Sequence, residues 1–234
     1  SPIIPTLANF KEKMEIEAKA DGTLNRLNCS EFHINVGDFI KTEGSVFIEN
    51  LLYPVSATLK GNIAFTAGYE GINLLFTQIG NTDKMPVFLQ HFGDVSFQGD
   101  ISGDSTNFVL TDGVFNTTSG KVNTNFILYS DKEKNQLVYS GKVQTEDFDL
   151  GNLLNNPLWG NTAFNLNING QYENSQYPAI ALTGLINHLE YSEYDYKSII
   201  LTGQYKYGKL DGEVELNDKN GSILINGRFN PVKK

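Results

Sequence analysis

The side chains best suited to binding a transition metal are three histidines spread along the chain. His33, His91 and His188 fall in different segments, and none has a second ligand at the spacing typical of a metal site. An isolated imidazole is usually solvated or hydrogen-bonded. We therefore expect no metal site.

Carboxylates are the next candidates, and three of them cluster at Glu146, Asp147 and Asp149. The two carboxylates of a glycosidase normally come from separate strands that face a cleft. These three are adjacent, and Asp149 is placed to cap a short helix or loop that Pro157 ends. We predict that element within residues 147–157 and no catalysis there.

The remaining chemical motifs are absent or incomplete. "DKNG" at residues 218–221 shares letters with a calcium loop but lacks its later glutamate, so it predicts a hairpin turn. The sequence contains no GxSxG, P-loop, dinucleotide fingerprint or HExxH. We expect a protein that is not an enzyme and that needs no cofactor.

A tyrosine-rich segment, "LEYSEYDYKS", offers a different chemistry. Tyr191, Tyr194 and Tyr196 alternate with carboxylates and could form a glycan-binding platform on a surface or extracellular β-sandwich. Tyr194 and Tyr196 fall on the face opposite Ile199 and Leu201 unless a bulge intervenes. Glycan binding is the alternative function, and a scaffold without any ligand is a third.

Composition limits the partners and leaves the compartment open. The 234 residues carry a net charge of −9, which disfavours nucleic acid and anionic lipid headgroups. A single cysteine, Cys29, excludes an internal disulfide. No run of about 18 apolar residues is present, as a membrane-spanning helix would require. Because the sequence opens on "SPIIP" and closes on "FNPVKK", we expect a segment of a longer protein.

The elements that would position a site are strands, and one strand type recurs seven times. Each copy has one glycine with apolar residues before and after it, at alternate positions, as in "FNLNINGQY". Side chains alternate across a strand, so the glycine and these apolar residues share one face. The glycines are Gly61, Gly99, Gly141, Gly170, Gly184, Gly203 and Gly227.

Glycine on the apolar face of a strand marks a bend or a close backbone approach. Such bends would crease the sheet, and we expect the residues two positions before each glycine to line the crease. These groove-lining candidates are Leu59, Phe97, Tyr139, Ile168, Leu182, Leu201 and Ile225.

The pattern predicts an all-β fold over residues 1–234 as a single elongated domain. We expect a curled antiparallel meander of a dozen or more short strands with at most one or two short helices. Asp112-Gly113 and Ser119-Gly120 are turn pairs that would divide residues 107–130 into three strands. Residues 68–92 are less regular: "GINLLFTQIG" predicts either a strand or a short helix, and "DKMPVFLQHF" predicts a helical or loop insertion. The crease forms either an accessible apolar groove or a closed two-sheet sandwich, and these residues alone leave both open.

The resemblance to a known family rests on several segments. They are the turn "FDLGNLL" (148–154), the glycine strand "GNTAFNLNINGQ", "LEYSEYDYKSI", and "LDGEVELND" leading into a final glycine strand. The upstream stretch "FQGDISGDSTNFVLTDGVFNTTSGKVNTNFIL" belongs with them. Over residues 93–230 the chain resembles the TamB (translocation and assembly module subunit) and AsmA-like proteins of Bacteroidetes-type bacteria.

This resemblance implies a β-taco, a creased sheet with an apolar interior. It implies a periplasmic location, with the parent protein anchored in the inner membrane, and a role in outer-membrane biogenesis. The expected partners are phospholipid acyl chains or unfolded outer-membrane proteins, with a TamA-type outer-membrane barrel as a further partner. Unlike whole members of the family, this chain is short and unanchored, so it would supply only a segment of the conduit.

Overall fold

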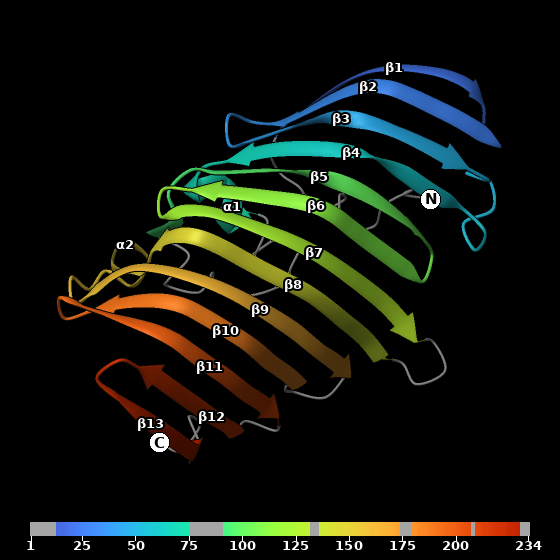
Figure 1. Cartoon of the computed structure of the whole chain (residues 1–234). Coiled ribbons are helices and arrows are strands. Elements are labelled where there is room, and N and C mark those ends of the chain that lie inside the picture. The colour runs from blue at the N-terminus through green and yellow to red at the C-terminus, as the bar shows by residue number, and fades with distance from the viewer. Residues whose placement is uncertain (1–12, 75–90, 132–135, 174–178, 207–208, 230–234) are drawn as a thin grey trace.

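A computed structural model describes residues 13–74, 91–131, 136–173, 179–206 and 209–229. Within them, thirteen antiparallel strands form one open sheet whose spatial order equals the chain order, from β1 to β13 (Figure 1). Each strand therefore pairs only with the strands before and after it. The prediction of an all-β antiparallel meander is confirmed, and a closed sandwich does not form.

The strands are mostly ten or more residues long, with apolar residues at alternate positions. They are β1 (Met14–Thr23), β2 (Arg26–Val36), β3 (Ile40–Glu49), β4 (Thr58–Ala67), β5 (Val95–Asp104), β6 (Asn107–Thr117), β7 (Gly120–Asp131), β8 (Gln136–Asp149), β9 (Trp159–Glu173), β10 (Ala179–Tyr191), β11 (Tyr194–Lys206), β12 (Lys209–Asp218) and β13 (Gly221–Phe229).

Bulges interrupt the ladders at several positions and help to curl the sheet. Register shifts occur between Gln98 and Asp100 in β5, between Leu110 and Gly113 in β6, and between Thr145 and Phe148 in β8. A bulge bends its strand and increases the local twist. The curl is therefore distributed over many strands.

Two short helices, α1 (Tyr69–Leu74) and α2 (Leu150–Leu154), lie at the same end of the strands (Figure 1). We call this the helix end and the opposite one the hairpin end. Ile72 of α1 packs onto the apolar side of the sheet. The buried cluster that it joins consists of Val36, Ile40, Ala67, Ile72 and Val95. The helix end is thus the part of the sheet with a conventional core.

Several local predictions are confirmed. Asp149 caps α2, its Oδ1 accepting a hydrogen bond from the backbone N–H of Asn152 at 2.8 Å. Ser119 lies in the turn between β6 and β7, and the turn after Asp218 joins β12 to β13. The segment predicted as a strand or a short helix begins within α1, while residues 75–90, which hold most of the predicted insertion, lie outside the described residues.

The predicted turn at Asp112-Gly113 is wrong. β6 runs through both residues, so residues 107–130 form two strands and not three. Asp112 has a φ of 51°, and its N–H donates to Asn125 Oδ1 at 2.9 Å across the bulge. An Asp-Gly pair supplies the unusual backbone conformation that a turn needs, but a bulge uses the same conformation.

Candidate functional site

The candidate site is the side of the sheet that carries the strand glycines, called here the apolar face. A row of directly paired residues crosses this face from strand to strand. It has one residue from each strand, and all of them are glycine, cysteine or apolar residues. From β1 to β13 it consists of Ala20, Cys29, Val46, Gly61, Ile101, Leu110, Phe126, Gly141, Ile168, Leu182, Gly203, Gly212 and Gly227. We call it the central row.

A second row runs beside it toward the hairpin end and is built in the same way from β2 to β12. Its members are Leu27, Ile48, Leu59, Gly103, Phe108, Leu128, Tyr139, Gly170, Ile180, Tyr205 and Leu210. Most of these side chains are half-buried, since no second layer of sheet covers them. The apolar face is therefore a continuous surface rather than a closed core.

The predicted groove-lining residues fall in different rows of this face. Ile168 and Leu182 are direct partners in the central row, whereas Leu59 and Tyr139 lie in the hairpin-end row. Leu201 and Ile225 belong to a third row of the same face, on the helix-end side of the central row. Leu201 pairs with Gly184, and Ile225 pairs with Val214.

Phe97 lies differently from the other six. It is only 5% exposed, and its ring packs between Phe65 and Phe115 with centroid distances of 5.3 and 4.6 Å. Phe65 and Phe115 pack in turn against the buried cluster beneath α1. Phe97 thus belongs to the packed core of the helix end.

The glycines of β3 to β10 are positions where neighbouring strands approach closely. A Cβ built at Gly61, Gly141 or Gly170 would lie less than 3.0 Å from a backbone carbonyl oxygen of the adjacent strand. At Gly170 it would also meet the Tyr139 ring, and at Gly141 the Phe126 ring. These glycines make room for a neighbouring strand, so we expect a side chain there to be destabilising.

Three glycines near the other edge are different. Gly203, Gly212 and Gly227 face one another in the central row, across β11, β12 and β13. A Cβ at Gly227 would have no atom within 4 Å, and one at Gly203 would meet a single atom at 3.8 Å. This stretch of the central row is bare. The predicted crease glycines therefore fall into a filled group and an unfilled group.

An apolar pocket of about 200 Å³ lies beside the bare glycines, toward the helix end. Trp159, Tyr191, Tyr196 and Ile199 line it, and Ile223 and Ile225 bound it at the β13 edge. Ile223 and Ile225 are 52% and 60% exposed. The pocket suits an aliphatic group and offers no charged partner for a ligand.

The three tyrosines take part in this arrangement. Tyr191 packs on Trp159 at a centroid distance of 4.7 Å, and Tyr194 meets Tyr196 edge-on at 4.6 Å. β11 changes face at Ser198, whose φ is 57°, so Tyr196 and Ile199 line the same pocket. The β10–β11 register does not shift there, and the nearby register shift lies between β9 and β10, at Ile186 and His188.

Two tyrosine hydroxyls near the site donate hydrogen bonds within the protein. The Tyr194 hydroxyl donates to Asp218 Oδ1 at 2.7 Å, and this hydrogen bond raises the pKa of Tyr194. Burial raises the pKa of Tyr139, whose hydroxyl donates to the Ala179 carbonyl at 3.2 Å. Of the three tyrosines, Tyr191 and Tyr196 line the apolar pocket.

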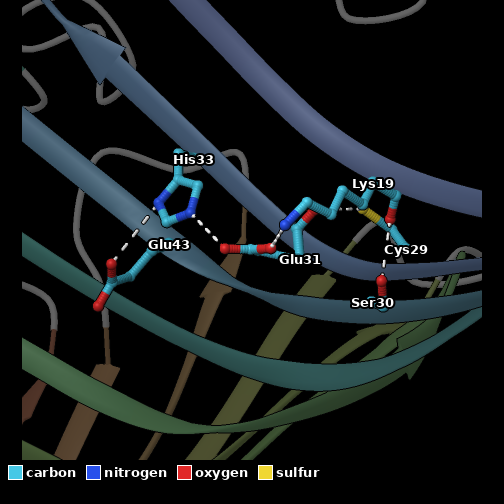
Figure 2. Close-up of polar contacts among 6 residues, drawn as sticks. All are labelled: Lys19, Cys29, Ser30, Glu31, His33 and Glu43. Carbon is cyan, nitrogen blue, oxygen red and sulfur yellow. Dashed lines mark hydrogen bonds and ion pairs between the residues drawn. The ribbon is translucent and has the colours of Figure 1, made fainter.

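Charged side chains gather on the opposite face, as Figure 2 shows for β1 to β3. Lys19 Nζ lies 2.5 Å from Glu31, whose second oxygen lies 3.0 Å from His33 Nε2. The hydrogen bond from Lys19 is the main cause that lowers the pKa of Glu31 to about 2. The side chains of this network are exposed.

The other titratable candidates do not line the apolar pocket. His188 Nδ1 is 3.3 Å from Asp195, and His91 offers its backbone carbonyl to the Thr118 hydroxyl. Glu146 and Asp147 are exposed at the bulge of β8. In the ranges that the structure describes, no group of three His, Cys, Asp or Glu side chains could hold a metal ion.

Neither described helix has the length and hydropathy to span a bilayer.

Several residues of the apolar face escaped the sequence analysis. Phe108, Leu110, Phe126 and Leu128 lie in β6 and β7, where the expected turn at Asp112-Gly113 obscured their alternation. In β12 the pattern of Leu210, Gly212, Val214 and Leu216 matches the recurrent glycine strand and could have been found. Gly44 in β3 has Thr42 in place of one apolar neighbour, which hid that copy.

No family model, curated protein or solved structure matches this chain.

Proposed function

We propose that this chain is a non-catalytic periplasmic segment of a TamB/AsmA-like protein in outer-membrane biogenesis. In this proposal its apolar face is a groove for phospholipid acyl chains or for unfolded outer-membrane protein. A TamA-type barrel would be the downstream partner. The proposal rests on the sequence resemblance together with the chemistry of the apolar face.

The observation that carries it is the central row, which crosses all thirteen strands without a polar side chain. Neighbouring strands are about 4.8 Å apart, so the row is roughly 60 Å long along the curve of the sheet. An acyl chain that fills one leaflet is about 15 Å long and would cover about three strands. A continuous row lets such a chain move sideways without crossing a polar barrier.

The charge distribution favours binding through the tails of a lipid. The net charge of −9 repels anionic headgroups, while the apolar face offers about 25 cal/mol per Å² of buried apolar area. Such binding has no chemical selectivity, which suits a carrier. It also needs no catalytic group.

The test compares the two faces of the same three strands. Ile168→Asp, Leu182→Asp and Leu201→Asp together place charge on the apolar face. The matched control is Asn167→Asp, Thr183→Asp and Thr202→Asp, three residues that face one another on the opposite side of β9, β10 and β11. Binding of a fluorescent phospholipid and native mass spectrometry of co-purified lipid report the loading.

We expect the apolar-face variant to lose phospholipid while the control keeps it, with both remaining folded by circular dichroism. A folded apolar-face variant that still loads fully would rule out the groove. If lipid never binds but an unfolded outer-membrane protein crosslinks to the face, the client is protein. If neither binds to the wild-type chain, the proposed function fails.

A further inference from the structure

The loop between β3 and β4 places large apolar side chains in solvent at the hairpin end of the sheet (Figure 1). Its sequence, "NLLYPVSA" at residues 50–57, contains no charged residue. Leu52, Tyr53 and Val55 are 58%, 61% and 81% exposed. The neighbouring β5–β6 turn at the same end is "DSTN" (104–107), which is polar. An exposed apolar loop thus lies beside a polar one.

The turn between β1 and β2 lies against this loop and adds one apolar side chain. The backbone N–H groups of Asn50 and Leu51 donate to the carbonyl oxygens of Asn25 and Leu24, both at 3.0 Å. Leu24 is 52% exposed. We call the exposed apolar side chains of the two connections the apolar tip, which consists of Leu24, Leu51, Leu52, Tyr53 and Val55.

Much of the backbone of the loop already has hydrogen-bond partners within the protein. The N–H of Tyr53 donates to the Asn50 carbonyl at 2.8 Å, and the N–H of Ser56 donates to the Tyr53 carbonyl at 2.9 Å. The Val55 carbonyl accepts a hydrogen bond from the Ser105 hydroxyl at 3.1 Å. Unpaired backbone groups are a main obstacle to entry into hydrocarbon. The internal hydrogen bonds of the loop lower that obstacle.

From these features we infer that the apolar tip inserts into the surface of a lipid bilayer with zwitterionic headgroups. Aliphatic side chains and tyrosine suit the boundary between acyl chains and headgroups, because a tyrosine ring is apolar and its hydroxyl is polar. Arg26 and Glu49 lie next to the tip at the strand ends, 3.6 Å apart, where they can stay at the level of the headgroups. The net charge of −9 disfavours an anionic bilayer.

A bilayer fits the tip better than a protein partner does. A protein interface surrounds its apolar centre with polar contacts that fix the orientation of the partner. The loop has no charged side chain, and many of its backbone groups are already bonded within the protein. Hydrocarbon requires only apolar area, without direction. The inference does not depend on the proposed loading of the apolar face, because the tip lies in loops outside it.

The experiment is flotation of the full chain with phosphatidylcholine vesicles. Wild type should float with the vesicles. Leu52→Asp together with Val55→Asp should weaken binding to the vesicles by about a hundredfold, because each removes one inserted side chain and adds a charge. The matched control is Ile127→Asp with Ile200→Asp, two residues outside the tip that are also exposed. The control should float as wild type does, and circular dichroism verifies the fold of each variant.

The apolar-face variant with aspartate at residues 168, 182 and 201 separates this inference from the proposed function. It should lose phospholipid loading and still float, whereas the tip variant should load phospholipid and fail to float. If the tip variant floats as wild type does while the apolar-face variant does not, membrane contact runs through the apolar face and the inference is overturned.

A fluorescent label tests insertion without a charged substitution. In a Cys29→Ser background, Val55→Cys carries a nitrobenzoxadiazole label whose emission should shift to the blue when phosphatidylcholine vesicles are added. The same label at Ile127→Cys should not respond. A wild-type chain that stays in the aqueous fraction overturns the inference, as does a label at residue 55 that remains in water while the chain floats.

Discussion

The glycines of β3 to β10 and those of β11 to β13 have the same sequence context but different surroundings. At Gly170 the Tyr139 ring and a carbonyl oxygen of β10 occupy the space that a side chain would need. At Gly227 that space is empty. One motif thus serves close packing in the first group and leaves a bare, exposed stripe in the second.

This difference shows that a glycine strand is not in itself a binding feature. In the first ten strands the sheet uses glycine to bring backbones and rings together, and the apolar face is filled from within. At Gly203 and Gly227 none of the described residues fills this space, and the apolar pocket lies beside it. An added side chain at Gly227 would therefore meet open space.

The largest expected effect comes from filling an occupied position. Gly170→Ala forces a methyl group against the Tyr139 ring and against a backbone oxygen that cannot move away. We expect a loss of about 2–3 kcal/mol in the free energy of unfolding, the upper part of the range for overpacking. Urea denaturation measures it.

Tyr139→Ala provides the control for the ring. Gly170→Ala should cost less in that background, by about 1 kcal/mol, because only the backbone oxygen still opposes the methyl group. Equal costs in both backgrounds would show that the ring does not require the glycine.

A much smaller effect is expected at the bare position. Gly227→Ala meets no atom within 4 Å and replaces the residue that loses most entropy on folding. The variant should be stabilised by about 0.5 kcal/mol or remain unchanged. Thermal and urea denaturation of Gly227→Ala and Gly170→Ala, measured side by side, test this prediction. A penalty like that of Gly170→Ala would remove the distinction between the two groups.

The smallest expected effect is the loss of stability at low pH that arises from two turns, one in each region. Asp104, between β5 and β6, accepts hydrogen bonds from the N–H groups of Thr106 and Asn107, of which the Thr106 bond is the main cause that lowers its pKa from 3.8 to about 2. Asp218, between β12 and β13, has its pKa lowered mainly by the Tyr194 hydroxyl. Both carboxylates stabilise the fold above their unfolded pKa, and the gain is lost as the pH falls through the folded value.

Stability should therefore fall between about pH 4 and pH 2. Asp104→Asn should flatten this slope more than Asp218→Asn does, because the Asp104 carboxylate accepts four hydrogen bonds, from the N–H groups and side chains of Thr106 and Asn107, and Asp218 accepts three. Urea midpoints measured across this range test it. An unchanged slope in Asp104→Asn would show that the turn contributes nothing to acid sensitivity.

Much of the fold could be predicted from local features of the sequence. The alternation around each glycine predicted strands on which Ile168 and Leu182 share a face, and Asp149 and Pro157 predicted the position of α2. These features depend on neighbours within a few residues. The pairing register of the strands could not be predicted from such local features, because every turn and bulge along the chain shifts it.

The filled and bare glycines could not be told apart in advance for the same reason. Gly141 and Gly227 have similar neighbours in sequence, but Gly141 lies under Phe126 of the previous strand whereas Gly227 lies beside another glycine. The bulge at Asp112 was mistaken for a turn because both use the same residue pair. The central row, the strongest feature of the candidate site, therefore became visible only when the pairing of all thirteen strands was known.

The order of the strands determines how the sheet unfolds. Because β1 to β13 pair strictly with their neighbours in sequence, no strand fixes two distant parts of the chain together. Stability is then close to a sum over adjacent pairs, as in repeat proteins. Damage at one hairpin stays near that hairpin, and the sheet frays from its edges inward. A structure of this kind can be lengthened or shortened by whole hairpins while the remainder keeps its shape.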